Sequence, residues 1–194
     1  MLVQNSFEYA KKSKYANKKK QPDKEVRYSI SAHLMVAIAI EGIINEIGEV
    51  VLGKLNWEKI ERKPTLDKWQ KLSAINDKVP FVREKEPLLT VKRVVDVRNS
   101  IAHPKVIDFG NDIMVRSKNG KLKKKINPSN KIKEGDKIWL GYADILNQFN
   151  YRSAFNIIEK SISAIKKLRN HLSISGLQWL DTIEKDIAKT KKMH

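Results

Sequence analysis

The stretch ISAHLMVAIAIEGIINEIGEVV, residues 30–51, decides the fold class of this chain. Its apolar residues recur every three or four positions, which is the spacing of one face of an α-helix. Gly53 follows directly, and glycine commonly ends a helix. The sequence therefore predicts a first long helix over residues 23–53. Its apolar positions are Ile30, Leu34, Ala37, Ile40, Ile44, Ile47 and Val51.

Four further segments carry the same helical spacing. Shorter helices are predicted over residues 65–78 and 86–103, and a proline follows each of them closely. A second long helix is expected over 142–172, and a last helix over 177–189. There is no internal repeat of solenoid period. Together these segments predict a mainly all-α fold, an up-and-down bundle of four to five helices.

Residues 105–140 have a different pattern. Asn119-Gly120 lies between two short alternating runs, which is a strong signal for a hairpin turn. Residues 138–140 supply a third short apolar run. We expect a small β-hairpin insertion before the last long helix, with a basic edge. Lysines on an exposed strand also prevent edge-to-edge aggregation, so the edge need not bind a ligand. The lysines of this edge are Lys121, Lys123, Lys124 and Lys125.

The first 22 residues are polar and basic, with lysines at positions 11, 12, 14 and 18–20. We expect little of this segment to be buried, and interpret residues 1–22 as a basic N-terminal arm or a loosely docked helix. Residues 23–194 then form a single helical domain.

Charge points to a polyanionic partner. The chain has 39 Lys and Arg against 22 Asp and Glu, which gives a net charge of +17. Such an excess attracts polyanions over long range, and nucleic acid is the usual one. The absence of cysteine excludes disulfides, thiolate metal sites and a cysteine nucleophile. No apolar run is long enough to span a bilayer and the N-terminus has no signal-peptide core, so we expect a cytoplasmic protein without membrane contact.

The string VRNSIAHP, residues 97–104, carries the candidate chemistry. Asn99 and His103 are four residues apart and therefore share a helix face, whereas Arg98 falls among the apolar positions. A charge there is costly unless it is paired or faces a ligand. His103 is at the helix end, where an imidazole can act as general base or acid. The adjacent guanidinium can hold a phosphate by two parallel hydrogen bonds.

A purely structural interpretation of these residues stays open. Glu41 also lies within the apolar arc of the first long helix, so it is a candidate ion-pair partner for Arg98. His103 is then an ordinary helix-terminal residue. His33, on the apolar arc of the same helix, either supports the site or is a core histidine with a satisfied hydrogen bond. No histidine spacing suggests a metal site, and no cofactor is expected.

Arg98, Asn99 and His103 resemble the signature of the HEPN superfamily: Arg, four to six residues, then His, with a polar residue after the Arg. The resemblance includes the helical context and spans most of residues 25–172. It implies a metal-independent endoribonuclease in which a base removes the 2′-OH proton and the product carries a 2′,3′-cyclic phosphate. It further implies a homodimer with a composite site containing two copies of His103. Arg98 stabilises the phosphorane there, and Asn99 positions the phosphate or His103.

The resemblance also implies a toxin or an antiviral-defence effector, with an antitoxin or defence-system partner. HEPN toxins often have Tyr two residues after the His as a modification site, but this chain has Lys105 there, so adenylylation at that position is not expected. Lys105 and the lysines of the insertion are the expected RNA contacts. Two alternatives remain: a non-catalytic HEPN-like module that binds nucleic acid or mediates assembly, and a partner of an acidic protein.

Overall fold

The computed structural model describes most of the chain. The described residues are 2–75, 78–102, 113–116, 122–125, 137–138, 148–175 and 179–192. Within them the protein is mainly helical, as the sequence predicts. The helices are α1 (Leu2–Lys18), α2 (Pro22–Leu52), α3 (Lys54–Glu58), α4 (Thr65–Ser73), α5 (Leu88–Ala102), α7 (Tyr151–Leu172) and α8 (Trp179–Lys192).

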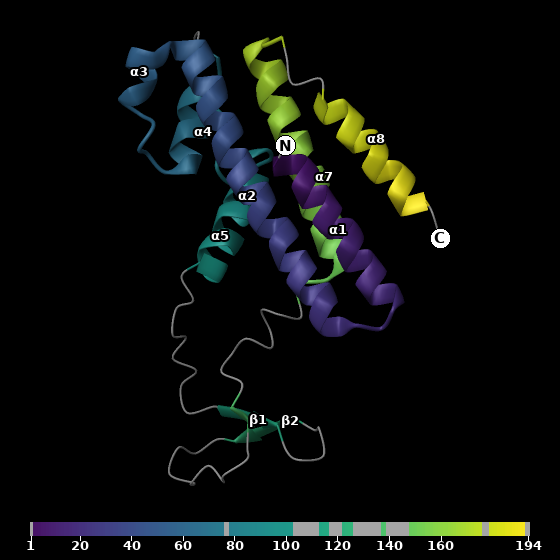
Figure 1. Ribbon diagram of the computed structural model, residues 1–194. Helices are drawn as coiled ribbons and strands as arrows, with labels where there is room; N and C mark the ends of the chain where they lie inside the picture. Colours follow the sequence, from purple (N-terminus) through teal and green to yellow (C-terminus); the bar gives the residue numbers. More distant parts are fainter. Residues whose placement is uncertain are drawn as a thin grey trace.

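Helix α2 is the central element of the bundle, as the periodicity of residues 30–51 predicts. It lies beside α1, α7 and α5, and α7 also packs against α1 and α5 (Figure 1). Helices α2 and α7 start at the same end of the bundle, where Ser29 Oγ donates to the Asn150 carbonyl at 2.9 Å. The core therefore runs along α2, and Ile40 and Ile44 of α2 belong to the same fully buried cluster as Ile158 and Ile162 of α7.

The N-terminal segment is part of this core, so the interpretation of residues 1–22 as an arm with little buried surface is wrong. Val3, Phe7 and Ala10 are spaced along one face of α1, and all three are buried. The Phe7 ring packs edge-on against Phe155 of α7, with the ring centroids 6.0 Å apart. One lysine of this helix is buried as well: Lys14 donates through Nζ to the Thr190 carbonyl of α8 at 2.7 Å.

Helix α7 starts nine residues later than Tyr142, the predicted first residue. Asn150 has an extended backbone, with φ −137° and ψ 172°, and its side chain accepts a hydrogen bond from the Ser153 amide. Ser153 Oγ in turn accepts from the Asn150 amide, which completes a capping box. An extended residue at 150 excludes a continuous helix through this point. Asparagine favours such caps because its side chain competes for backbone hydrogen bonds.

Helix α2 ends where predicted, because Gly53 adopts a positive φ of 73° that suits glycine. The short helix α3 then turns Trp57 back against α2. A Cβ atom at Gly48 would lie 2.2 Å from the Trp57 ring, so only glycine fits there. Helix α4 begins as predicted but ends at Ser73 instead of residue 78, and Ser73 Oγ accepts a hydrogen bond from the Phe81 amide in the returning loop.

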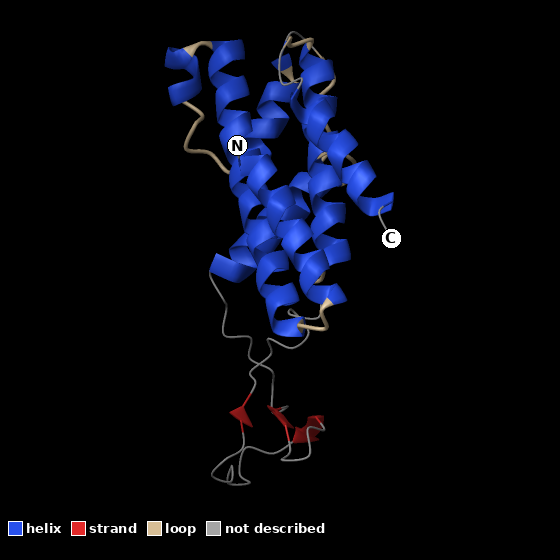
Figure 2. Cartoon of the chain, turned by 45° about the vertical axis from the view of Figure 1, so that its right-hand side comes forward, coloured by secondary structure: helices blue, strands red, loops and turns tan. Residues whose placement is uncertain are grey.

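Three short strands lie apart from the helical body in the view of Figure 2. Strand β1 (Ile113–Arg116) pairs antiparallel with β2 (Leu122–Lys125) and with β3 (Lys137–Ile138), in the order β2-β1-β3. The Asn119-Gly120 turn and most of residues 105–140 lie outside the described residues. The hairpin insertion as a unit with a basic edge therefore stays a prediction.

Candidate functional site

Arg98 lies on α5 and contacts α2 through its guanidinium. Its Nη2 donates to Glu41 Oε2 at 2.9 Å, which forms an ion pair between the two helices. The Arg98 side chain is 32% exposed and the Glu41 side chain 40%, so both charges lie at the edge of the helix interface. The pairing that the sequence suggested is therefore present. Because solvent still reaches both groups, Arg98 can also contact a ligand at this surface.

Asn99 restrains the same guanidinium from a second side. Its Oδ1 accepts a hydrogen bond from Nη1 of Arg98 at 3.1 Å, and Asn99 itself is exposed. Glu41 and Asn99 thus occupy one nitrogen each of the guanidinium. An arginine held in this way is oriented before any ligand arrives, which reduces the entropy lost on binding. The contact between Asn99 and Arg98 was not expected from the sequence, which suggested a phosphate or His103 as the partner of Asn99.

His103 lies just outside the described residues, because the description of α5 stops at Ala102. Of the expected RNA contacts, Lys105 and Lys121 also lie outside. Lys123, Lys124 and Lys125 belong to β2, but the structure does not describe their side chains. The described part of the site therefore consists of Arg98, Asn99 and Glu41.

His33 belongs to the core and not to this cluster. It is buried, its Nδ1 lies 2.8 Å from the Ser29 carbonyl oxygen, and its ring meets the Phe149 ring edge-on at 5.0 Å. Burial lowers the pKa of His33, and the hydrogen bond to Ser29 only partly opposes this effect. His33 is also eight residues from Glu41 on one helix, about 12 Å along its axis. The core-histidine interpretation is confirmed.

Sequence reasoning missed one charged residue beside the site, Lys68 on α4. Only 2% of Lys68 is exposed, and its Nζ donates to Asn45 Oδ1 on α2 at 2.8 Å. Asn45 is one helical turn after Glu41. Burial lowers the pKa of Lys68, against the opposing attraction of the Glu41 and Glu61 carboxylates. The sequence did contain a signal for the burial of Lys68. This lysine lies on the same face of α4 as Thr65 and Leu72, which are also buried.

Glu41 therefore carries charge interactions with both neighbouring helices. It pairs directly with Arg98 of α5, and its field acts on the buried ammonium of Lys68 of α4. If a phosphate drew Arg98 away, the Lys68 charge would remain to stabilise Glu41. The Arg98 side chain can thus move from Glu41 to a ligand while a positive charge stays near the Glu41 carboxylate.

Metal and membrane features are not found in the described part of the chain. Among the described residues no group of three His, Asp or Glu side chains is arranged to hold a metal ion. No described helix is long and apolar enough to cross a bilayer. Comparison with protein-family models, with curated proteins and with solved structures finds no match for this chain. The site must therefore be interpreted from its own residues.

Proposed function

We propose that this protein is a metal-independent endoribonuclease whose active site contains Arg98, Asn99 and His103. The observation that carries the proposal is the oriented guanidinium of Arg98, held by Glu41 at 2.9 Å and Asn99 at 3.1 Å while still open to solvent. The net charge of +17 supports RNA as the ligand.

The reaction needs a base, an acid and a group that stabilises negative charge. The base removes the 2′-OH proton, O2′ forms a bond to the adjacent phosphorus, and the bond from phosphorus to O5′ breaks. The acid donates a proton to the leaving O5′. His103 serves as base or acid, and each such role contributes about 10²–10⁴-fold. Arg98 exchanges Glu41 for the phosphorane oxygens, where a charge-assisted bidentate contact is strongest.

A homodimer supplies the second histidine. The solvent face of α2 next to Glu41 supports this arrangement, because Ile38 is 47% exposed and Gly42 follows it one turn later. Among the described residues, nothing outside the backbone of α2 itself lies within 4 Å of the place of a Cβ at Gly42, so packing within this part of the chain does not require glycine there. A glycine inside a helix costs about 1 kcal/mol relative to alanine. Close approach of a second copy explains both its presence and the exposed isoleucine.

Sedimentation tests the dimer. Ile38→Glu is expected to give a monomer that melts near wild type and no longer cleaves RNA. Val50→Glu is the matched control, because Val50 is 71% exposed on another face of the same helix. A wild-type protein that sediments as a monomer at the concentrations that support cleavage would remove the composite site from the proposal.

The β-insertion is proposed to contact the RNA backbone through its lysines. Replacement of Lys123, Lys124 and Lys125 by Gln is then expected to weaken binding of single-stranded RNA. The slope of log K against log salt should fall by about 0.7 for each lost phosphate contact. An unchanged slope would assign these lysines to edge protection instead.

The cleavage test uses pure protein in EDTA with a broad RNA pool and mapped product ends. We expect 2′,3′-cyclic phosphate ends from wild type and none from His103→Ala or Arg98→Ala. The control is Arg93→Ala, an exposed arginine on the same helix α5. Cleavage that persists in Arg98→Ala, or disappears equally in Arg93→Ala, would contradict the assignment.

A second function is favoured by one observation, which is that Arg98 already has a carboxylate partner in Glu41. On this alternative the protein is a non-catalytic HEPN-like module that binds nucleic acid or mediates assembly. RNA binding without cleavage by wild type, and equal binding by His103→Ala, would support it.

A further inference from the structure

Helix α4 and the loop before α5 form a pocket that has no part in the cluster around Arg98. Its volume is about 410 Å³, within the usual range of small-ligand pockets. Arg83 lies in the loop before α5, whereas Arg98 lies within that helix and pairs with Glu41. Neither Arg98 nor Glu41 lines the pocket. The lining residues are Lys63, Asp67, Gln70, Lys71, Ala74, Pro80 and Arg83.

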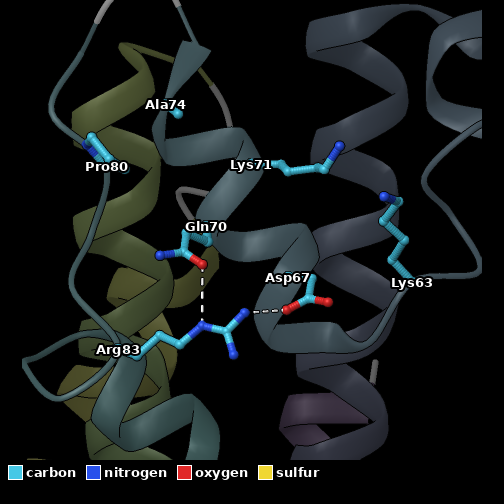
Figure 3. A pocket seen from close by; sticks show the side chains of 7 residues that line it. All are labelled: Lys63, Asp67, Gln70, Lys71, Ala74, Pro80 and Arg83. Carbon is cyan, nitrogen blue, oxygen red and sulfur yellow. Dashed lines mark hydrogen bonds and ion pairs between the residues drawn. The ribbon is translucent and has the colours of Figure 1, made fainter.

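Arg83 is held in place within this pocket. Its Nη2 pairs with Asp67 Oδ1, and its Nε donates to Gln70 Oε1 at 3.1 Å. Figure 3 shows the Arg83 side chain crossing from the loop to these two residues of α4. The guanidinium is thus oriented at the pocket wall, and within the described part of the chain its Nη1 group has no hydrogen-bond partner. Preorganisation of this kind favours oxyanions such as phosphate, which offer two oxygens to the planar guanidinium.

The other two cations of the pocket lack a carboxylate of their own. Among the described residues, no acidic side chain lies within 4 Å of the Lys63 or Lys71 ammonium, and both lysines are exposed. The described lining therefore has three cations and one carboxylate, and Arg83 already pairs with that carboxylate. Like charges gathered in a concavity raise the local concentration of anions.

The opposite end of the pocket is apolar. Ala74 and Pro80 line it, and Val79 and Val82 flank Pro80 with 81% and 47% of their surfaces exposed. Exposed apolar residues beside a cationic pocket suit a ligand with a flat apolar part and a charged part. A nucleotide has both, in the form of a base and a phosphate.

We propose that this pocket binds a nucleotide, with its phosphate between Lys63, Lys71 and Arg83 and its base against Ala74 and Pro80. The nucleotide is either free in solution or part of a single strand. This proposal does not depend on ribonuclease activity, because none of these residues belongs to the proposed active site. The pocket then serves as a second point of phosphate recognition, separate from the residues around Arg98.

Calorimetric titration of the full chain tests the proposal with four probes. The probes are AMP, adenosine, inorganic phosphate and a short single-stranded oligodeoxynucleotide, which lacks the 2′-OH and so cannot be cleaved by 2′-OH attack. The pocket variant is Lys63→Gln with Lys71→Gln. The matched control is Lys160→Gln with Lys167→Gln, two exposed lysines of α7 that do not line the pocket. Both variants remove two positive charges.

We expect AMP to bind wild type, and the pocket variant to weaken this binding by about tenfold or more, the equivalent of 1.4 kcal/mol. The control should change binding by less than about twofold, and adenosine should bind much more weakly than AMP. Lys63→Arg with Lys71→Arg should restore binding, because it keeps the charge. If only the oligodeoxynucleotide binds in a pocket-dependent way, the phosphate belongs to a strand. Equal weakening in both double variants, or no binding of any phosphate probe, would overturn the proposal.

Discussion

Nη2 of Arg98 lies 2.9 Å from Oε2 of Glu41, and the two side chains join α5 to α2 while 32% of Arg98 and 40% of Glu41 stay exposed. Ion pairs with this exposure contribute little, because water screens both charges and two long side chains must be ordered. The geometry therefore suggests that the ion pair orients Arg98 and contributes little to the stability of the fold. A stabilising role predicts a large coupling energy between Glu41 and Arg98, whereas an orienting role predicts a small one.

A double-mutant cycle measures this difference. We expect Glu41→Gln and Arg98→Gln each to lower the free energy of unfolding by less than about 1 kcal/mol, with a coupling energy of about 0.5 kcal/mol. The measurement is urea denaturation of the two single variants, the double variant and wild type at pH 7. A coupling energy of about 3 kcal/mol would instead mark a structural pair that the fold needs.

Phe7→Ala is expected to lower the free energy of unfolding by about 3–5 kcal/mol, because Phe7 is 2% exposed and packs edge-on against Phe155. Tyr15→Ala on the same helix is the control, since Tyr15 is 63% exposed and should cost far less. Thermal melts of the two variants distinguish a core helix from a mobile arm. Similar melts would mean that α1 does not contribute to the core in solution.

Helix α2 is predicted well because its apolar residues far outnumber its charged ones. Residues 30–51 are apolar enough that the periodicity fixes α2 by itself. In α1 the same periodicity exists, but polar residues separate Val3 from Phe7, lysines follow Ala10, and the interior partner Phe155 comes from a distant part of the chain. Local pattern shows that a face is apolar, but not whether another element covers it.

The candidate site likewise contains some contacts that the sequence predicts and others that it does not. The sequence alone suggests the pair of Glu41 and Arg98, because each is a charged residue within the apolar arc of its helix. A charge in such a position is costly unless an opposite charge pairs with it. Lys68 and Asn45 meet only because α4 folds back on α2, so neither residue predicts the other. The pocket around Arg83 depends on the path of an irregular loop, which no periodicity describes.

His33 gives the protein a pH-dependent stability. Burial lowers the pKa of His33 in the folded state, so between that value and 6.5 the unfolded chain binds more protons than the folded one. The free energy of unfolding must then fall as pH decreases from 6.5. The stability that the neutral His33 contributes is lost completely below its folded pKa. His33→Asn removes it and should show a shallower decline between pH 7 and pH 5 by urea denaturation. Parallel curves would contradict a buried neutral imidazole.

Lys68 makes a prediction of the same sign on the alkaline side. Burial lowers the pKa of Lys68 below its ordinary 10.5, so near 10.5 the unfolded chain binds more protons than the folded one. Stability must therefore rise with pH between the folded pKa and 10.5, as the buried ammonium loses its proton. Below the folded pKa, the desolvation cost of the charge is present in full.

Lys68→Met tests this prediction, because methionine has a similar shape without the charge. Removal of a buried charge with a single neutral partner is expected to leave the free energy of unfolding at pH 7 unchanged or to raise it by about 1 kcal/mol. Any gain in the free energy of unfolding over wild type should become smaller as pH approaches 10.5. Urea denaturation at pH 7, 8.5 and 10 measures this change. Lys71→Met, an exposed change on the same helix, controls for the added methionine. If Lys68→Met is instead strongly destabilised at every pH, attraction to Glu41 and Glu61 outweighs desolvation, and Lys68 is part of what holds α4 against α2.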